Sequence, residues 1–166
     1  ISAPLNSGMF LSTNNGSSWT SVNSGLPSNL TVEAMAVSGS SVFVAGNNNQ
    51  VFLSTNNGAS WSSVSSGMSG GSVYSLAISG SNIFAGTFLG VYKSTNNGSS
   101  WSSVNTGLTN SVVYSLAISG NTVYAGTNGG VYQSINNGGN WMAANNGIPP
   151  SLEIKSIAIS GNNIFA

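Results

Sequence analysis

The stretch Ser12–Trp19, with the sequence STNNGSSW, recurs without change at Ser94–Trp101. Close variants of it, STNNGASW and SINNGGNW, occupy Ser54–Trp61 and Ser134–Trp141. All four tryptophans of the chain therefore end a copy of one motif, and they are spaced 42, 40 and 40 residues apart. A constant period near 40 residues is typical of repeat architectures, in which one supersecondary unit is copied and stacked.

Four short strand-like runs recur in each repeat. In the third repeat they are Val73–Ser79, Asn82–Thr87, Val91–Ser94 and Trp101–Asn105. The runs are rich in β-branched and aromatic residues and are bounded by Gly, Asn or Ser, as strands are. The Asn-Gly pair inside each motif supplies the positive φ angles of a tight hairpin turn. Because no segment has helical periodicity, the sequence predicts an all-β fold with four antiparallel strands per repeat.

Four-stranded units with this period predict a single β-propeller domain over residues 1–166. Large and small residues alternate along the innermost strands, for example in Leu76-Ala77-Ile78, which suits strands covered on both faces by neighbouring blades. A β-solenoid is the alternative, although its repeats usually contain fewer strands. The predicted units are a half-blade at 8–25, blades at 32–67, 72–107 and 112–147, and a half-blade at 153–166.

The eight-residue motif resembles the Asp-box, or bacterial neuraminidase repeat, which reads Ser/Thr-x-Asp-x-Gly-x-Thr-Trp. In that family the box lies on the turn between the third and fourth strands of a propeller blade. The Ser, Gly and Trp positions match in every copy, whereas Asn replaces the Asp. The matching residues are Ser12, Asn14, Gly16 and Trp19; Ser54, Asn56, Gly58 and Trp61; Ser94, Asn96, Gly98 and Trp101; and Ser134, Asn136, Gly138 and Trp141.

The Asn-for-Asp replacement retains the turn, because an Asn carbonyl still accepts a backbone N–H and forms an Asx-type turn. The resemblance implies that the box is a structural staple, remote from any active site. It also implies that the four tryptophans pack between sheets.

The phase of the repeats predicts two complementary half-blades. The chain opens on the third strand of a blade, at Met9–Ser12, and stops at Ala166, midway through the second strand of another. If the half-blades join within one chain, a four-bladed ring closes. If they join between chains, the product is a larger ring or an open filament. A longer protein cut inside a blade would look the same.

One position of the repeat carries opposite charges at the two ends of the chain. Glu33, Tyr74, Tyr114 and Lys155 each stand six residues before an equivalent glycine. In a ring or a head-to-tail filament the first and last repeats become neighbours, so an inter-repeat ion pair between Glu33 and Lys155 is predicted. The alternative is two unrelated solvated charges.

Charge is nearly absent from this chain. Its 166 residues are 40% hydrophobic and carry two lysines, two glutamates and no histidine. A nucleic-acid partner is not expected, because phosphate neutralisation requires clustered Lys and Arg. Membrane insertion is not expected either, since no apolar run approaches the roughly 18 residues of a span. A net charge near zero favours self-association, because colloidal repulsion is missing.

The Asp-box resemblance suggests a glycoside hydrolase, but the residues of this chain do not favour that activity. Sialidases bind the substrate carboxylate with three arginines and use an Asp acid, and this chain has neither residue type. Other glycosidases need a pair of carboxylates, for which only Glu33 and Glu153 are available. Without His or Cys there is no Ser-His pair, thiolate or zinc site. We therefore expect no enzyme activity, catalytic residue, metal or cofactor.

The sequence-based hypothesis is a non-catalytic, extracellular structural or assembly module that associates with itself, as a surface or filament subunit. A carbohydrate-binding propeller that takes neutral glycans is the alternative, with Tyr74, Tyr114, Phe88 and Asn128 as candidate contacts. A degenerate glycoside hydrolase is the remote alternative.

Overall fold

The structure, a computed structural model, describes residues 8–166, and these form β-strands without any helix. Twelve of the strands make three antiparallel sheets of four strands each. The first sheet consists of β3 (Val32–Ser38), β4 (Ser41–Gly46), β5 (Val51–Ser54) and β6 (Ser62–Ser63). The second consists of β7 (Val73–Ser79), β8 (Asn82–Thr87), β9 (Gly90–Ser94) and β10 (Ser102–Ser103). The third consists of β11 (Val113–Ser119), β12 (Thr122–Thr127), β13 (Gly130–Ser134) and β14 (Met142–Ala143), so the predicted all-β class is confirmed.

Two further antiparallel pairs stand at the ends of the described chain. The N-terminal hairpin is β1 (Phe10–Leu11) with β2 (Thr20–Ser21). The C-terminal hairpin is β15 (Ala158–Ser160) with β16 (Asn163–Phe165). Counted by their place in the repeat, the first pair corresponds to the two outer strands of a sheet and the second pair to the two inner strands.

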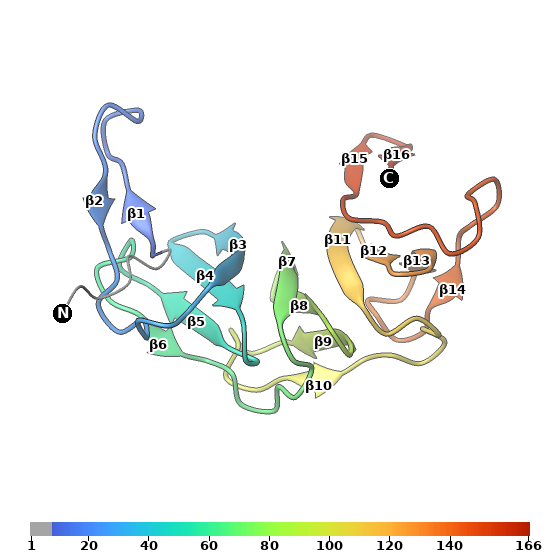
Figure 1. The fold of residues 1–166 in the computed structure, drawn as a ribbon, viewed down its shortest axis with the longest axis horizontal. Helices are drawn as coiled ribbons and strands as arrows, with labels where there is room; N and C mark the ends of the chain where they lie inside the picture. Colours follow the sequence, from blue (N-terminus) through green and yellow to red (C-terminus); the bar gives the residue numbers. More distant parts are fainter. Residues whose placement is uncertain (1–7) are drawn as a thin grey trace.

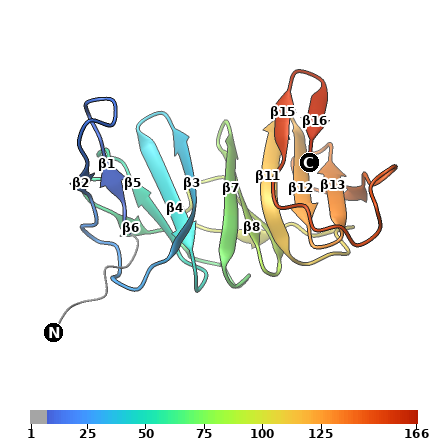
Figure 2. The same cartoon turned by 45° about the horizontal axis from the view of Figure 1, so that its top comes forward.

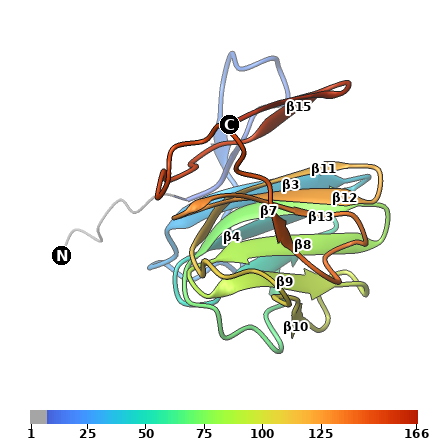
Figure 3. The same cartoon turned by 90° about the vertical axis from the view of Figure 1, so that its right-hand side faces the viewer.

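The sheets follow one another along an open arc. Figure 1 shows the N-terminal hairpin at one end of the arc, the C-terminal hairpin at the other end, and the three sheets between them. The first strands of successive units lie side by side in the order β3, β7, β11 and β15 (Figure 2). Seen from the side in Figure 3, β15 continues this row next to β11. The arrangement leaves the ends of the arc apart.

The motif turns are held by short-range hydrogen bonds that the Asn side chain organises. In the third copy, Ser94 Oγ donates to Asn96 Oδ1 at 2.9 Å and accepts from the Gly98 amide at 2.9 Å. Asn96 Oδ1 also accepts the Ser100 amide at 2.9 Å. Asn97 and Gly98 then take φ angles of 55° and 81°, which only Gly and a few polar residues adopt readily. The turn therefore forms with Asn in the place of Asp.

Asn96→Ala is expected to lower the free energy of unfolding by about 1–2 kcal/mol, because the Ser94 hydroxyl and the Ser100 amide lose their acceptor. Asn96→Asp is the matched control. It retains the Oδ1 acceptor. The Asn96 Nδ2 group, which donates to Ser100 Oγ, becomes a carboxylate oxygen to which the Ser100 hydroxyl can donate instead, so we expect less than half of that loss. Urea unfolding curves of the two variants test this, and equal losses would contradict a role for the acceptor.

The hydrophobic core lies between successive sheets. Phe43 of the first sheet packs in one cluster with Ile83 and Trp101 of the second. Phe84 of the second sheet packs in the same way with Val123 and Trp141 of the third. Each inter-sheet space therefore contains an aromatic ring from β4 or β8, which is covered by the strands and the motif tryptophan of the next sheet.

Three of the four motif tryptophans are buried, and each is tied to the unit before it. The indole N–H of Trp101 donates to the Val64 carbonyl at 2.7 Å, and Trp61 and Trp141 make the same bond one unit earlier and later. Trp19 differs, because its side chain is 63% exposed while that of Trp101 is 5% exposed. The prediction that all four tryptophans pack between sheets is therefore wrong for Trp19 in a single chain, since no sheet of residues 8–166 covers its outer side.

The predicted strands agree with the observed ones except at the outer edge. Val73–Ser79 and Asn82–Thr87 match β7 and β8, and Val91–Ser94 begins one residue earlier as β9. The run Trp101–Asn105 is reduced to Ser102–Ser103. The Trp101 amide donates to Ser66 O in the segment before it, at 2.9 Å, instead of extending the ladder with β9.

Candidate assembly interface

The N-terminal hairpin exposes residues whose counterparts are buried in every complete sheet. Phe10 occupies the position of Tyr92 on β9, and its exposed fraction is 55%, compared with 6% for Tyr92. Trp19 on the same hairpin is exposed as well. The apolar character of these positions is a property of the repeat, and the covering unit is missing from the described residues.

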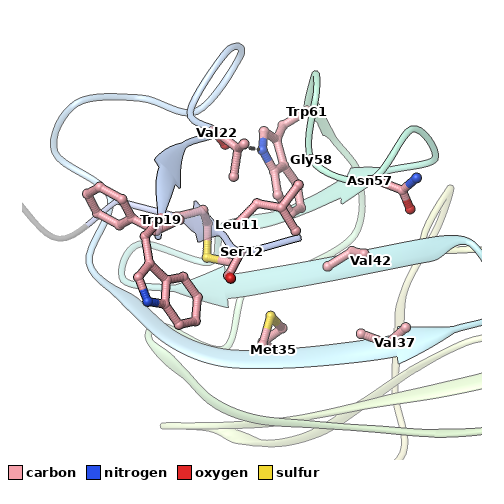
Figure 4. Close-up of a pocket in the computed structure, with 12 residues that line it drawn as sticks. Leu11, Ser12, Trp19, Val22, Met35, Val37, Val42, Asn57, Gly58 and Trp61 are labelled. Carbon is pink, nitrogen blue, oxygen red and sulfur yellow. Dashed lines mark hydrogen bonds between the residues drawn. The ribbon is translucent and has the colours of Figure 1, made fainter. Parts of the chain in front are cut away.

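A groove of about 270 Å³ opens between this hairpin and the first sheet. We call it the N-terminal groove, and its lining includes Leu11 of β1, Met35 and Val37 of β3, Val42 of β4, Gly58 and Trp61. Figure 4 shows these side chains gathered around one space, with Trp19 at its side. Met35 and Val37 are exposed there, whereas the equivalent Leu76 and Ile78 pack against the core between the first and second sheets.

The C-terminal hairpin presents a second apolar face. Phe165 occupies the position of Phe84, and its exposed fraction is 60%, compared with 0% for Phe84. Ile164 is exposed too, although the equivalent Ile83 is buried. A hollow of about 250 Å³, which we call the C-terminal hollow, lies between Tyr124 of β12 and Ile159 and Ile164 of the hairpin.

The charged residues near β11 form a compact group. Lys155 Nζ lies 2.7 Å from Glu153 Oε2. The same ammonium stands 3.3 Å from the centroid of the Tyr114 ring, and this ring lies 5.7 Å from the Tyr74 ring, centroid to centroid. The repeat position that holds Tyr74, Tyr114 and Lys155 therefore forms a continuous row of side chains from β7 to the segment just before the C-terminal hairpin.

The predicted Glu33–Lys155 ion pair is not formed within this chain. Lys155 bonds instead to Glu153, which lies two residues away in the segment that precedes β15. Glu33 is on β3, and β7 and β11 stand between that strand and β15 (Figure 2). A contact between Glu33 and Lys155 of different copies remains a prediction.

The Glu153–Lys155 pair predicts how stability responds to pH. The hydrogen bond and charge of Lys155 lower the pKa of Glu153 below its ordinary 4.5, and the hydrogen bond to Glu153 raises the pKa of Lys155 above its ordinary 10.5. The glutamate contributes stability above pH 4.5 that is lost as the pH falls through its folded-state pKa. The lysine contributes stability below pH 10.5 that is lost as the pH rises through its folded-state pKa.

We therefore expect the urea midpoint to be flat between about pH 5.5 and 9.5 and to fall slightly on either side. Glu153→Gln should remove the part of the acid-side fall that this pair contributes. A midpoint that moves steadily between pH 6 and pH 9 would contradict the expectation.

The other candidate site residues are only partly brought together. Glu33 and Glu153 belong to separated strands and segments, so this chain does not place its two carboxylates as a pair. Within residues 8–166 no cluster of His, Cys, Asp or Glu suits a metal ion. Among the candidate sugar contacts, Tyr74 and Tyr114 have neighbouring rings whose planes are tilted by 47°, whereas Phe88 and Asn128 occupy the β8–β9 and β12–β13 turns.

The main residues of the two exposed faces were not singled out from sequence. Phe10, Met35, Val37 and Phe165 lie outside the eight-residue motif. Their signal was nevertheless available, because each occupies a repeat position whose other copies are apolar.

No protein-family model and no curated protein matches the chain. Solved structures do match it. The computationally designed protein Ika4 superposes with a TM-score of 0.67 at 14% identity, over 87% of this chain and 89% of Ika4. An ancestral GH74 enzyme gives a TM-score of 0.65 at 32% identity, over 81% of this chain and 21% of the enzyme. YCF48 bound to D1 peptide gives 0.64 at 18% identity, over 85% of this chain and 49% of YCF48.

These neighbours include β-propeller proteins. The fold is propeller-like. The chain spans about a fifth of the GH74 enzyme and about half of YCF48, so the comparison describes only the architecture of this chain. In residues 8–166 we also find no helix with the length and apolar character needed to cross a membrane.

Proposed function

We propose that this chain is a non-catalytic, extracellular structural module that associates with itself. The observation that carries the proposal is the pair of exposed apolar faces on the terminal hairpins, whose counterparts are buried between the complete sheets. Exposed contiguous apolar surface of this kind marks interaction sites. The two faces belong to opposite halves of one repeat, so each lacks what the other supplies.

The charge distribution supports association and a structural role. With two positive and two negative side chains, copies of the chain have little net repulsion to overcome. The scarcity of titrating groups also suits an exterior where pH varies, which supports the extracellular assignment. The separation of Glu33 from Glu153 and the ion pair of Glu153 with Lys155 support a non-catalytic role.

The experiment is a measurement of mass against concentration, by sedimentation velocity and mass photometry, with negative-stain electron microscopy of the same samples. We expect species at multiples of the 16.7 kDa chain that become more abundant as the concentration rises. A monomer at every concentration up to the limit of solubility would overturn the proposal.

A second candidate function is the binding of neutral glycans, and the Tyr74–Tyr114 pair is the observation that favours it. The two rings lie 5.7 Å apart on neighbouring strands, and aromatic rings of this kind can contact the apolar face of a sugar. A glycan array with the chain, compared with a Tyr74→Ser, Tyr114→Ser variant, tests it. Absence of binding at millimolar sugar would count against this function.

A further inference from the structure

We propose that two copies of this chain join end to end by completing one four-stranded sheet, with β15–β16 of one copy supplying the inner strands and β1–β2 of the next copy the outer strands. This inference rests on the proposed function and names the surface and partner through which it operates. The occupant of both exposed faces is then a second copy of the same chain.

The complete sheets give the register of this joint. Between β8 and β9, Ile83 pairs with Ser94, Phe84 with Lys93 and Ala85 with Tyr92. The residues at the same repeat positions in the hairpins pair Ile164 with Ser12, Phe165 with Leu11 and Ala166 with Phe10 of the second copy. The joint therefore adds a β16–β1 ladder, which covers a strand edge on each hairpin.

The N-terminal groove has the lining that this register requires. In the chain, Phe84 packs in one cluster with residues of the third sheet, and its ring edge lies 3.1 Å from where a Cβ on Gly138 would be. Gly138 lies against that ring, and the third-sheet residues of the cluster include Leu116, Ile118, Val123 and Trp141. Their counterparts in the first sheet are Met35, Val37, Val42, Gly58 and Trp61, all of which line the N-terminal groove. Phe165 of another copy is thus the side chain that the groove would receive.

A row of glycines points to the same joint. Gly25, Gly67 and Gly107 lie directly against the carbonyl oxygen of Trp61, Trp101 and Trp141, the tryptophan of the unit that follows each of them. Gly147 has the same backbone conformation, with φ of 86°, yet no atom described in the structure comes within 4 Å of the place of its Cβ. The missing neighbour in this series is Trp19 of a second copy.

Trp19 then gains the bonds that the other three tryptophans make. Trp141 donates its indole N–H to the Val104 carbonyl at 2.6 Å and its amide to Thr106 O at 2.8 Å. In the next repeat, Ala144 and Asn146 stand at the positions of Val104 and Thr106, beside Gly147. Their carbonyl oxygens are therefore the corresponding acceptors. In the joint, Trp19 of the second copy donates to these two carbonyls and covers the C-terminal hollow.

Charge complementarity fits the same contact. Tyr74, Tyr114 and Lys155 are neighbours in a row across the first strands, and the next position of that row is Glu33 of the second copy. Glu33 is exposed on β3, and Lys155 can contact it while keeping its bond to Glu153. An end-to-end joint therefore brings opposite charges together.

A second copy satisfies both faces without disturbing the contacts between sheets. Figure 1 shows the two hairpins at opposite ends of an open arc, so joining them within one chain would need the packing between sheets to change along the arc. Such a head-to-tail contact leads to a closed ring of copies or to a filament.

Disulfide crosslinking tests the joint and its register, because the chain has no cysteine of its own. We would mix a Phe10→Cys chain with an Ala166→Cys chain under mild oxidation. A crosslinked heterodimer of twice the 16.7 kDa chain mass is expected on a non-reducing gel. The control mixes Phe10→Cys with Asn163→Cys, which lies three residues, or roughly 10 Å, along the strand and beyond the reach of a disulfide. No heterodimer should form in the control.

The outcomes separate this inference from the proposed function. If larger species form but neither mixture crosslinks, or both do so equally, the chain associates by another surface. The inference is then overturned, while the proposed function stands. If a chain carrying both Phe10→Cys and Ala166→Cys oxidises only to a monomer, the hairpins join within one chain or through other residues, and the inference is again overturned. If the chain neither associates nor crosslinks, both proposals fail.

A second variant tests the groove without cysteines. Phe165→Asp should weaken association by about 100-fold or more, since a buried aromatic anchor at the centre of an interface would be replaced by a charge. Phe88→Asp makes the same change at an aromatic side chain that is 50% exposed in the β8–β9 turn, and it should alter association less than about threefold. Equal effects of the two variants on association would overturn the role of Phe165.

Discussion

The Gly107→Ala chain is expected to lose about 2–5 kcal/mol of its unfolding free energy, a large part of the roughly 5–15 kcal/mol of a typical domain. Gly107 has a φ of 85°, where a Cβ costs about 1–2 kcal/mol. The added methyl would also overlap the Trp141 carbonyl oxygen, and displacing a packed neighbour costs about 1–3 kcal/mol more. Urea unfolding followed by tryptophan fluorescence measures the loss.

Gly147→Ala is the matched control for this prediction. Its φ of 86° is almost the same, but no described atom lies within 4 Å of the new methyl. Only the backbone cost of about 1–2 kcal/mol should therefore appear when the chain is monomeric. If the two variants were equally destabilised, the contact between Gly107 and the next tryptophan would not be the cause.

The parts of the fold that were predicted correctly are those decided by local chemistry. The strands Val73–Ser79 and Asn82–Thr87 are bounded by turn residues, and their pairing in a hairpin follows from the short connection between them. The Asn97-Gly98 turn has the positive φ angles that this residue pair predicts. Neither feature needs information from another unit of the repeat.

The parts that were missed depend on what lies across an interface. Trp19 has the same local sequence as Trp101, but its burial is decided by whether a unit precedes it. The Glu153–Lys155 pair could have been anticipated from two opposite charges that stand two residues apart in the sequence. Phe165 could have been anticipated from its repeat position, which Phe43 and Phe84 share. Repeat equivalence thus identifies an apolar position, but only the neighbouring unit decides whether that position is a core or a surface.

Trp101→Ala is expected to lower the unfolding free energy by about 3–5 kcal/mol, the usual cost of truncating a large buried aromatic residue. Trp101 is 5% exposed and packs with Phe43, Ile83 and other residues of the core between the first and second sheets. The substitution would also leave the Val64 carbonyl without the indole donor that stands 2.7 Å away. The measurement is again urea unfolding, at a protein concentration below that at which larger species form.

Trp19→Ala makes the same change in the same motif and serves as the control. In a single chain its side chain is 63% exposed and its indole bonds to no described residue, so we expect a loss of less than about 1 kcal/mol. When the protein concentration is raised until copies associate, the unfolding free energy of the unsubstituted chain should rise more than that of the Trp19→Ala variant. Association would bury Trp19 in the unsubstituted chain, and the variant has no indole to bury. Equal losses for Trp19→Ala and Trp101→Ala in the monomer would contradict the exposed position of Trp19. Equal stabilisation of unsubstituted chain and the Trp19→Ala variant by concentration would place the contact between copies away from this tryptophan.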